Sequence, residues 1–113
     1  MSMLLMNAIS LDASTTKNST AMTLSLDTCV SFHVSWTRLT GTLAGTLYLQ
    51  VSNDNSDWIT TTEVFPANPN TASAPGSTAE VWSGFGYKYA RIQYVPASGT
   101  GTMTIKAYSK RAG

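Results

Sequence analysis

The chain has 113 residues, a formal net charge of +1 and 12% charged residues, about half the usual charged share. This length predicts one domain, and the basic residues are too scattered to form a phosphate-binding stripe, which argues against a nucleic-acid partner. Cys29 is the only cysteine, so an intrachain disulfide and a cysteine metal cluster are excluded and folding in a cytoplasm is favoured.

The first 20 residues are predicted to be an N-terminal arm, or a first strand with a polar linker. Residues 1–11 are apolar and include Leu4 and Leu5, whereas residues 12–20 are polar. We place an ordinary first strand ahead of an arm that packs on a neighbouring subunit. The apolar run is short and lacks a basic flank, so it predicts neither a signal peptide nor a transmembrane helix, and no membrane partner is expected.

The middle of the chain alternates hydrophobic and polar residues, which predicts β-strands. The alternation occurs in four segments: Ala21–Leu26, Cys29–Thr37, Leu43–Val51 and Trp58–Phe65. Turns are expected at Asp27–Thr28, within residues 38–42 around a glycine, and at the polar residues 52–57. The last two of the four segments are expected to pair as a hairpin.

A long irregular stretch follows at residues 66–78, a length at which loops are usually functional or mobile. Residues 79–83 predict a short strand, and Gly84–Phe85–Gly86 permits a sharp bend after it. Residues 87–108 then show two alternating runs around a Pro/Ser/Gly turn, and we interpret them as a second hairpin. Its first run is expected to point Ala90, Ile92 and Tyr94 inward and Tyr87, Tyr89, Arg91 and Gln93 outward.

These segments predict an all-β fold, an antiparallel β-sandwich or jelly roll of about seven or eight short strands. The composition agrees, because the 14 Ser and 17 Thr residues favour turns and strands. No segment has a helical period, so no helix is available to cover a parallel sheet. The sandwich domain is expected at residues 21–109 and a flexible tail at residues 110–113.

Residues with catalytic or metal-binding chemistry are sparse. His33 lies between Ser31 and Ser35 on a polar strand face, but the Gly-x-Ser-x-Gly elbow of a nucleophilic serine is missing, and a surface histidine is the preferred interpretation. The oxygen-rich run at residues 53–57 lacks the EF-hand spacing, so an Asx-rich turn is preferred to a calcium site. We therefore expect no enzyme activity, no metal site and no cofactor.

The aromatic residues are the best candidates for binding. They are too many for one small core, so we divide them among the core, a subunit interface and a platform on which sugar rings stack. Among these candidates, the outward-facing residues at the start of the 87–108 segment are the first choice for a binding surface. The predicted contact residues are Tyr87, Tyr89, Arg91, Trp58 and Trp82, with Leu4 and Leu5 of the N-terminal segment.

Two stretches carry a resemblance to a known group of proteins. Residues 45–58 read GTLYLQVSNDNSDW, and residues 89–105 read YARIQYVPASGTGTMTI. They resemble small β-sandwich structural proteins of bacteriophage virions and, more broadly, galactose-binding-like jelly rolls. The resemblance covers roughly residues 29–108 and implies a structural or adhesive role. The expected role is a capsid decoration or cement subunit that stabilises the particle through subunit contacts, or else a tail component.

This resemblance also sets the expected partners and location. The partners are other copies of the chain, in a homo-oligomer for which such proteins suggest a trimer, and other virion proteins such as the major capsid protein. The location is the virion, after synthesis in the host cytoplasm. The alternative is a carbohydrate-binding module for adhesion or receptor binding, whose partner is a glycan.

Overall fold

The structure, a computed structural model, describes residues 2–24, 29–83 and 87–110, without the side chains of residues 63, 64 and 83. These residues form an all-β, antiparallel fold, which confirms the predicted fold class, and the described part contains no helix and thus none that could cross a membrane. The strands are β1 (Ser2–Leu11), β2 (Lys17–Asn18), β3 (Met22–Thr23), β4 (Cys29–Ser52), β5 (Ile59–Val64), β6 (Asn70–Thr71), β7 (Gly76–Ser83) and β8 (Tyr89–Lys110).

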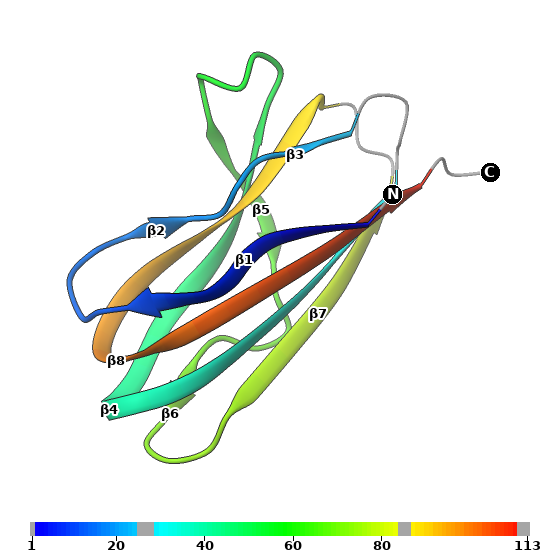
Figure 1. Cartoon of the computed structure of the whole chain (residues 1–113). Helices are drawn as coiled ribbons and strands as arrows, with labels where there is room; N and C mark the ends of the chain where they lie inside the picture. Colours follow the sequence, from blue (N-terminus) through cyan, green and yellow to red (C-terminus); the bar gives the residue numbers. More distant parts are fainter. Residues whose placement is uncertain (1, 25–28, 84–86, 111–113) are drawn as a thin grey trace.

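Two long strands, β4 and β8, organise the molecule. They pair with each other on both sides of a bend, from Cys29 opposite Lys110 to Ser52 opposite Tyr89, and the register shifts at the bend, between Arg38 and Gly45. Each doubles back near its middle, so the pair passes from one layer of the sandwich into the other (Figure 1). The hydrogen-bonded sheet is therefore continuous through both layers.

Glycines allow this folding over of β4 and β8. Gly41 and Gly99 have left-handed backbone angles, φ 65° and φ 74°, which side chains other than glycine seldom adopt. A Cβ atom on Gly99 would fall against the carbonyl group of Thr42. The Ser98 hydroxyl joins the two bends by donating to the carbonyl oxygen of Thr42 at 2.6 Å, and Arg38 Nε stabilises the bend of β4 by donating to the carbonyl oxygen of Gly41 at 2.7 Å.

The predicted hairpin at residues 87–108 is wrong. The two halves of β8 do not pair with each other, because each half pairs with a different half of β4. The predicted strands Cys29–Thr37 and Leu43–Val51 are likewise the two halves of β4, so neither β4 nor β8 is short. The alternation itself was predicted correctly, because Ala90, Ile92 and Tyr94 are all buried.

The two layers share β4 and β8 and add shorter strands at their edges. In the first layer, β1 and β7 flank the second half of β8 and the first half of β4. In the second layer, β2 and β3 pair with the first half of β8, while β5 and β6 pair with the second half of β4. The predicted pairing of Leu43–Val51 with the segment after Trp58 is thus present as β4 with β5.

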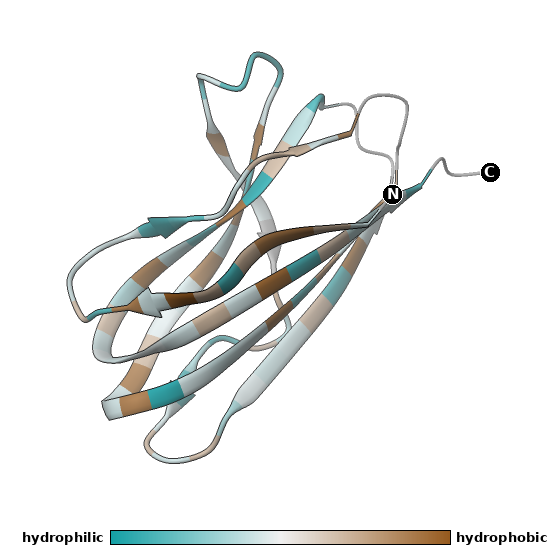
Figure 2. Cartoon of the chain, in the orientation of Figure 1, coloured by the Kyte–Doolittle hydropathy of each residue, from teal (hydrophilic) through white to brown (hydrophobic). Residues whose placement is uncertain are grey.

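The hydrophobic core lies between the layers, and apolar residues alternate with polar ones along the strands (Figure 2). Tyr94 is fully buried, and its hydroxyl donates to the carbonyl oxygen of Ala44 at 3.0 Å. Phe65 and Trp82 meet edge to face at 5.2 Å between β5 and β7. Burial of each large apolar side chain contributes about 1.5–3 kcal/mol to folding.

Residues 2–11 form β1, a strand of the first layer. β1 pairs with the end of β8, although its register shifts twice between Leu4 and Ile9, and Ala8 there has a left-handed φ of 50°. Leu5 is 3% exposed and Leu4 48% exposed. The predicted turn at Asp27–Thr28 and the bend at Gly84–Gly86 lie outside the described residues, as does the predicted tail beyond Lys110, the last residue of β8.

Candidate functional site

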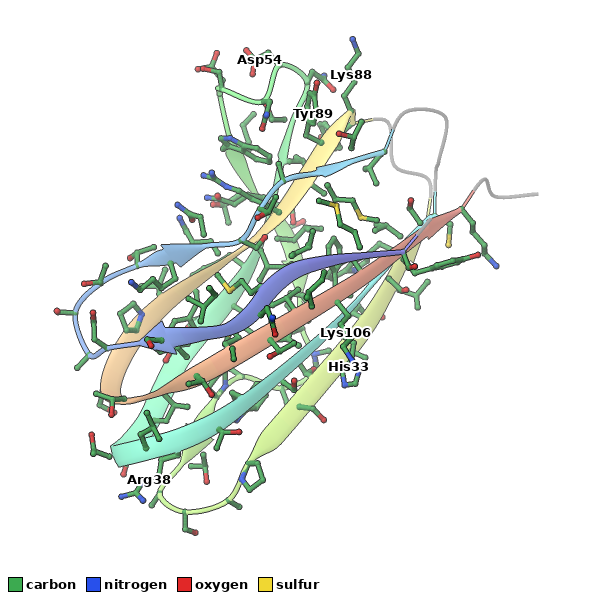
Figure 3. The ribbon with its side chains drawn as sticks, in the orientation of Figure 1. His33, Arg38, Asp54, Lys88, Tyr89 and Lys106 are labelled. Atoms are coloured by element: carbon green, nitrogen blue, oxygen red, sulfur yellow. The ribbon has the colours of Figure 1, made fainter. Side chains whose placement is uncertain are left out.

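The outer face of the second layer gathers most of the predicted contact residues. The pleat of β8 buries Ala90 and Ile92 and leaves Tyr89 and Arg91 half-buried on the outer face. Trp58 lies at the end of the β4–β5 turn, and Tyr87 precedes β8, so both reach the same end of this layer. Figure 3 shows Tyr89 and Lys88 beside Asp54 of that turn.

Arg91 is the centre of a row of contacts across three strands. Its Nε donates to Gln50 Oε1 at 2.8 Å, and Gln50 Nε2 donates in turn to the Thr60 hydroxyl at 3.1 Å. The guanidinium carbon lies 4.2 Å from the ring centroid of Trp58, which makes a cation–π contact. We call Trp58, Arg91, Gln50 and Thr60 the Arg91 row.

The electrostatics of this row favour a fixed positive charge. Desolvation by burial lowers the pKa of Arg91, but a guanidinium stays protonated at neutral pH. The Trp58 contact and the Gln50 bond occupy part of the guanidinium, and they hold it in one orientation. The row therefore presents a pre-oriented cation beside an aromatic ring, an arrangement suited to recognition.

The β4–β5 turn is built by its own side chains. The Asp54 carboxylate accepts from the Ser56 and Asp57 backbone amides at 2.9 and 2.8 Å and from the Ser52 hydroxyl at 2.9 Å. These bonds, the Asp57 and Ser56 amides first, lower the pKa of Asp54 from 3.8 to about 2. The Asp54 oxygens, considered above as calcium ligands, therefore accept hydrogen bonds within the turn, in line with the Asx-turn interpretation.

A shallow depression of about 260 Å³ lies between this turn and the start of β8. Tyr87 and Ile59 line it and are 42% and 66% exposed. Asn53 also lines it, and the Asn53 side-chain oxygen accepts from the Lys88 backbone amide at 3.1 Å. The depression joins an exposed apolar surface to the acidic turn.

The remaining predicted contact residues lie elsewhere. Trp82 is half-buried and packs between the layers, 5.8 Å from the Phe32 ring, and Leu5 belongs to the core. Leu4 faces outward on β1 in the first layer. The sequence reasoning missed Gln50, Thr60 and Ile59. Gln50 could have been found, because it alternates with the hydrophobic residues Leu49 and Val51.

The outer face of the first layer is a second exposed surface. Lys106 of β8 stands opposite His33 of β4, and both are exposed (Figure 3). Tyr108 and Val81, both opposite Ser31, lie two residues further along the strands and line shallow depressions of about 320 and 180 Å³. His33 is thus a surface histidine with a lysine neighbour, which agrees with the interpretation preferred from the sequence.

Comparison with known proteins identifies the fold. No protein-family profile and no curated protein sequence matches the chain. The PBSX exported protein XepA superposes on 100% of the chain with a TM-score of 0.65 and 20% identity. The N-terminal cellulose-binding domain of Cellulomonas fimi β-1,4-glucanase C superposes on 94% of it, with a TM-score of 0.51, 10% identity and 78% of that domain covered.

The chain has the β-sandwich fold of these two proteins. At such identities the likeness establishes the fold alone. The chain spans 37% of the XepA chain, so it corresponds to only a part of that protein.

The two outer faces differ in the side chains that they expose. Within residues 2–24, 29–83 and 87–110, no three His, Cys, Asp or Glu side chains come together as metal ligands. What the faces do offer is rings, a cation, amides and hydroxyls. The Arg91 row and the depression beside Tyr87 are the candidate site.

Proposed function

We propose that the protein is a structural component of a bacteriophage virion: a capsid decoration or cement subunit, or else a tail component. The observation that carries the proposal is the superposition of the whole chain on a phage exported protein, XepA of PBSX. The likeness of residues 45–58 and 89–105 to virion β-sandwich proteins points the same way.

Such a subunit would act by contact alone. It would bury exposed apolar side chains against copies of itself and against other virion proteins such as the major capsid protein, which stabilises the particle. Ile59, Val81 and Tyr108 are large hydrophobic residues exposed on the described surface. A fold continuous through both layers is a rigid support for these contacts, and no catalytic step is required.

Electron microscopy and mass spectrometry of purified phage particles test this proposal. The protein is expected in the particles at a fixed number of copies, at one place on the head or tail. Particles that lack it are expected to lose integrity on heating or dilution, and adding the purified protein back should restore them. Its absence from purified particles would contradict the proposal.

The second candidate function is carbohydrate binding, and the Arg91 row favours it. Sugars stack on aromatic rings and bond to amides and guanidinium groups, and Trp58, Gln50 and Arg91 offer these groups side by side. The C. fimi cellulose-binding domain shares the fold. However, the Arg91 guanidinium already covers one face of the Trp58 ring, so a sugar must use the other face or displace it.

Titration with a panel of soluble oligosaccharides, followed by tryptophan fluorescence, tests this second function. If it holds, Trp58→Ala abolishes binding, which is measured for this variant by titration calorimetry because it lacks the reporting ring, whereas Lys106→Ala, which removes a cation from the other layer, leaves binding unchanged. Arg91→Ala separates the two stacking geometries, because it strengthens binding if the sugar needs the covered ring face and weakens it otherwise. Unaltered fluorescence with every sugar would remove the candidate.

A further inference from the structure

The edges of the two layers differ in how they are protected against pairing with another strand. In natural proteins, edge strands avoid pairing with another chain because they are short, have an irregular register, or carry lysine or proline. In the described chain, β2, β3 and β6 each have two residues, and the pairings of β1 and β5 contain register shifts. β7 is the exception, because its eight residues pair with β4 in unbroken register, from Ser83 opposite Cys29 to Gly76 opposite Trp36.

The sequence of β7 adds little of this protection, since Glu80 is its one charged residue. It reads GSTAEVWS, without lysine, arginine or proline. Ser77, Ala79 and Val81 are exposed. Within the described residues, β4 is the sole strand that pairs with β7.

Hydrogen bonding shows which backbone groups of β7 point outward. The Val81 amide donates to the carboxylate of Glu80 at 2.9 Å, so it does not donate to β4. Because the two backbone groups of a residue point to the same side in an antiparallel strand and alternate along it, Ser77 and Ala79 face outward with Val81. The amides of Ser77 and Ala79 and the carbonyls of all three residues form a row to which another strand can bond, and the Val81 amide joins this row once the Glu80 carboxylate is displaced.

The inner side of β7 is fixed, so this edge is held in place. Trp82 packs on Phe65, and the Thr78 hydroxyl accepts from the Ala67 backbone amide at 3.2 Å. These contacts tie β7 to the segment that follows β5. An incoming strand would therefore meet a preformed template and would not need to order it.

We propose that two copies of the chain associate edge to edge through β7, antiparallel and centred on Ala79. The inference rests on the proposal that the protein assembles with itself, and it adds the strand and the register. Ala79 then stands opposite Ala79 of the second copy, and Ser77 stands opposite Val81. The first layers of the two copies join into one sheet.

Self-complementarity is the reason for choosing a second copy as the occupant. A twofold axis through Ala79 pairs residues 76–82 with themselves, which uses nearly all of β7. It places the smallest outward side chain at the centre and sets each Glu80 opposite a threonine, Thr78. A register centred on Glu80 would instead oppose two carboxylates, which destabilises a pair.

Disulfide trapping tests both the contact and its register. In a Cys29→Ser background, Ala79→Cys is expected to cross-link rapidly under mild oxidation, because facing residues of a hydrogen-bonded pair have Cα atoms about 5.5 Å apart. Ser77→Cys alone and Val81→Cys alone are not expected to cross-link, but their mixture is. Cross-linking of Ala79→Cys no faster than of a Thr37→Cys control would overturn the proposal.

Sedimentation measurements on the full chain provide the second test. The wild-type chain is expected to shift towards a dimer as its concentration rises, and Ala79→Lys is expected to remove this shift because two lysines would face each other. Thr37→Lys, an exposed position beyond the end of β7, should leave it unchanged, and circular dichroism checks that both variants are folded. If the chain associates but Ala79→Lys has no effect, β7 is not the interface, although self-assembly stands. A chain that stays monomeric at every concentration overturns both.

Discussion

Single residues decide where the two long strands fold over. Gly41 and Gly99 both have left-handed backbone angles. Only at Gly99 would an added Cβ atom clash with neighbouring backbone, that of Thr42 and Leu43. A side chain at Gly41 would meet only ordinary contact with Gly99. The two positions therefore separate the conformational cost of an alanine from its steric cost.

Gly41→Ala is expected to lower the free energy of unfolding by about 1–2 kcal/mol, the cost of a left-handed alanine. Gly99→Ala should cost at least about 1 kcal/mol more, because the bend of β4 must move away from the new Cβ. Urea denaturation of both variants beside the wild type measures the difference. Equal destabilisation would show that the close backbone at Thr42 has no energetic effect.

Asp54 makes the stability of the β4–β5 turn depend on acid. Its pKa is lowered from 3.8 to about 2 by the bonds that it accepts, so its contribution is complete above the unfolded value and is lost as the pH falls through about 2. In Asp54→Ala this acid-dependent loss should be missing. Asp57→Ala should keep most of it, because the larger contribution of Asp57 to the Asp54 carboxylate is its backbone amide, which this substitution retains. Hydrogen-exchange protection of the residue 56 and 57 amides, followed from pH 5 downwards, measures this acid-dependent loss.

At the scale of elements, the strands and the pairing of β4 with β5 were predictable, but the pairing of β4 with β8 was not. Alternation of neighbouring residues is local, so it correctly placed Ala90 inside and Arg91 outside. The Pro/Ser/Gly signal at residues 96–101 shows that the chain reverses, but it does not show whether the reversal stays within one layer or crosses to the other. That choice depends on β4, which lies far away in the sequence.

In the candidate site, too, local features were predictable and contacts between distant residues were not. The prediction brought Tyr89, Arg91 and Trp58 into one group, because they lie on polar faces or beside turns. The bond between Arg91 and Gln50 joins residues 41 positions apart, and no local pattern specifies it. The positive φ of Ala8 was equally hidden, since alanine gives no signal for a left-handed backbone.

The irregularity in β1 gives a prediction at this scale. Ala8 has a φ of 50°, and its amide donates to the Thr104 hydroxyl at 3.1 Å. Ala8→Gly is expected to stabilise the chain by about 0.5–1 kcal/mol, because relief of the left-handed strain exceeds the entropy cost of glycine. Asn7→Gly, the neighbouring exposed position without a positive φ, should destabilise it. Thermal unfolding decides, and a lower midpoint for Ala8→Gly would contradict the prediction.

At the scale of the whole molecule, β4 and β8 bind the two layers into one cooperative unit. A sandwich of two separate sheets can loosen one layer at a time, but here each long strand contributes to both layers. The pairing of β4 with β8 shifts register at the bends near Gly41 and Gly99 and resumes in the other layer. Loss of packing in one layer should therefore be transmitted to the other.

Ile105→Ala in the first layer tests this coupling. The substitution leaves a cavity at a fully buried position and is expected to cost about 2–5 kcal/mol. Hydrogen exchange should show the same loss of protection for the buried strand amides of both layers, including Ile92 and Leu49 of the second layer, because these open only with global unfolding. Leu4→Ala, an exposed position on an edge strand, should leave the second-layer amides unchanged. If Ile105→Ala weakens the first layer alone, the bends at Gly41 and Gly99 act as hinges between two independent sheets.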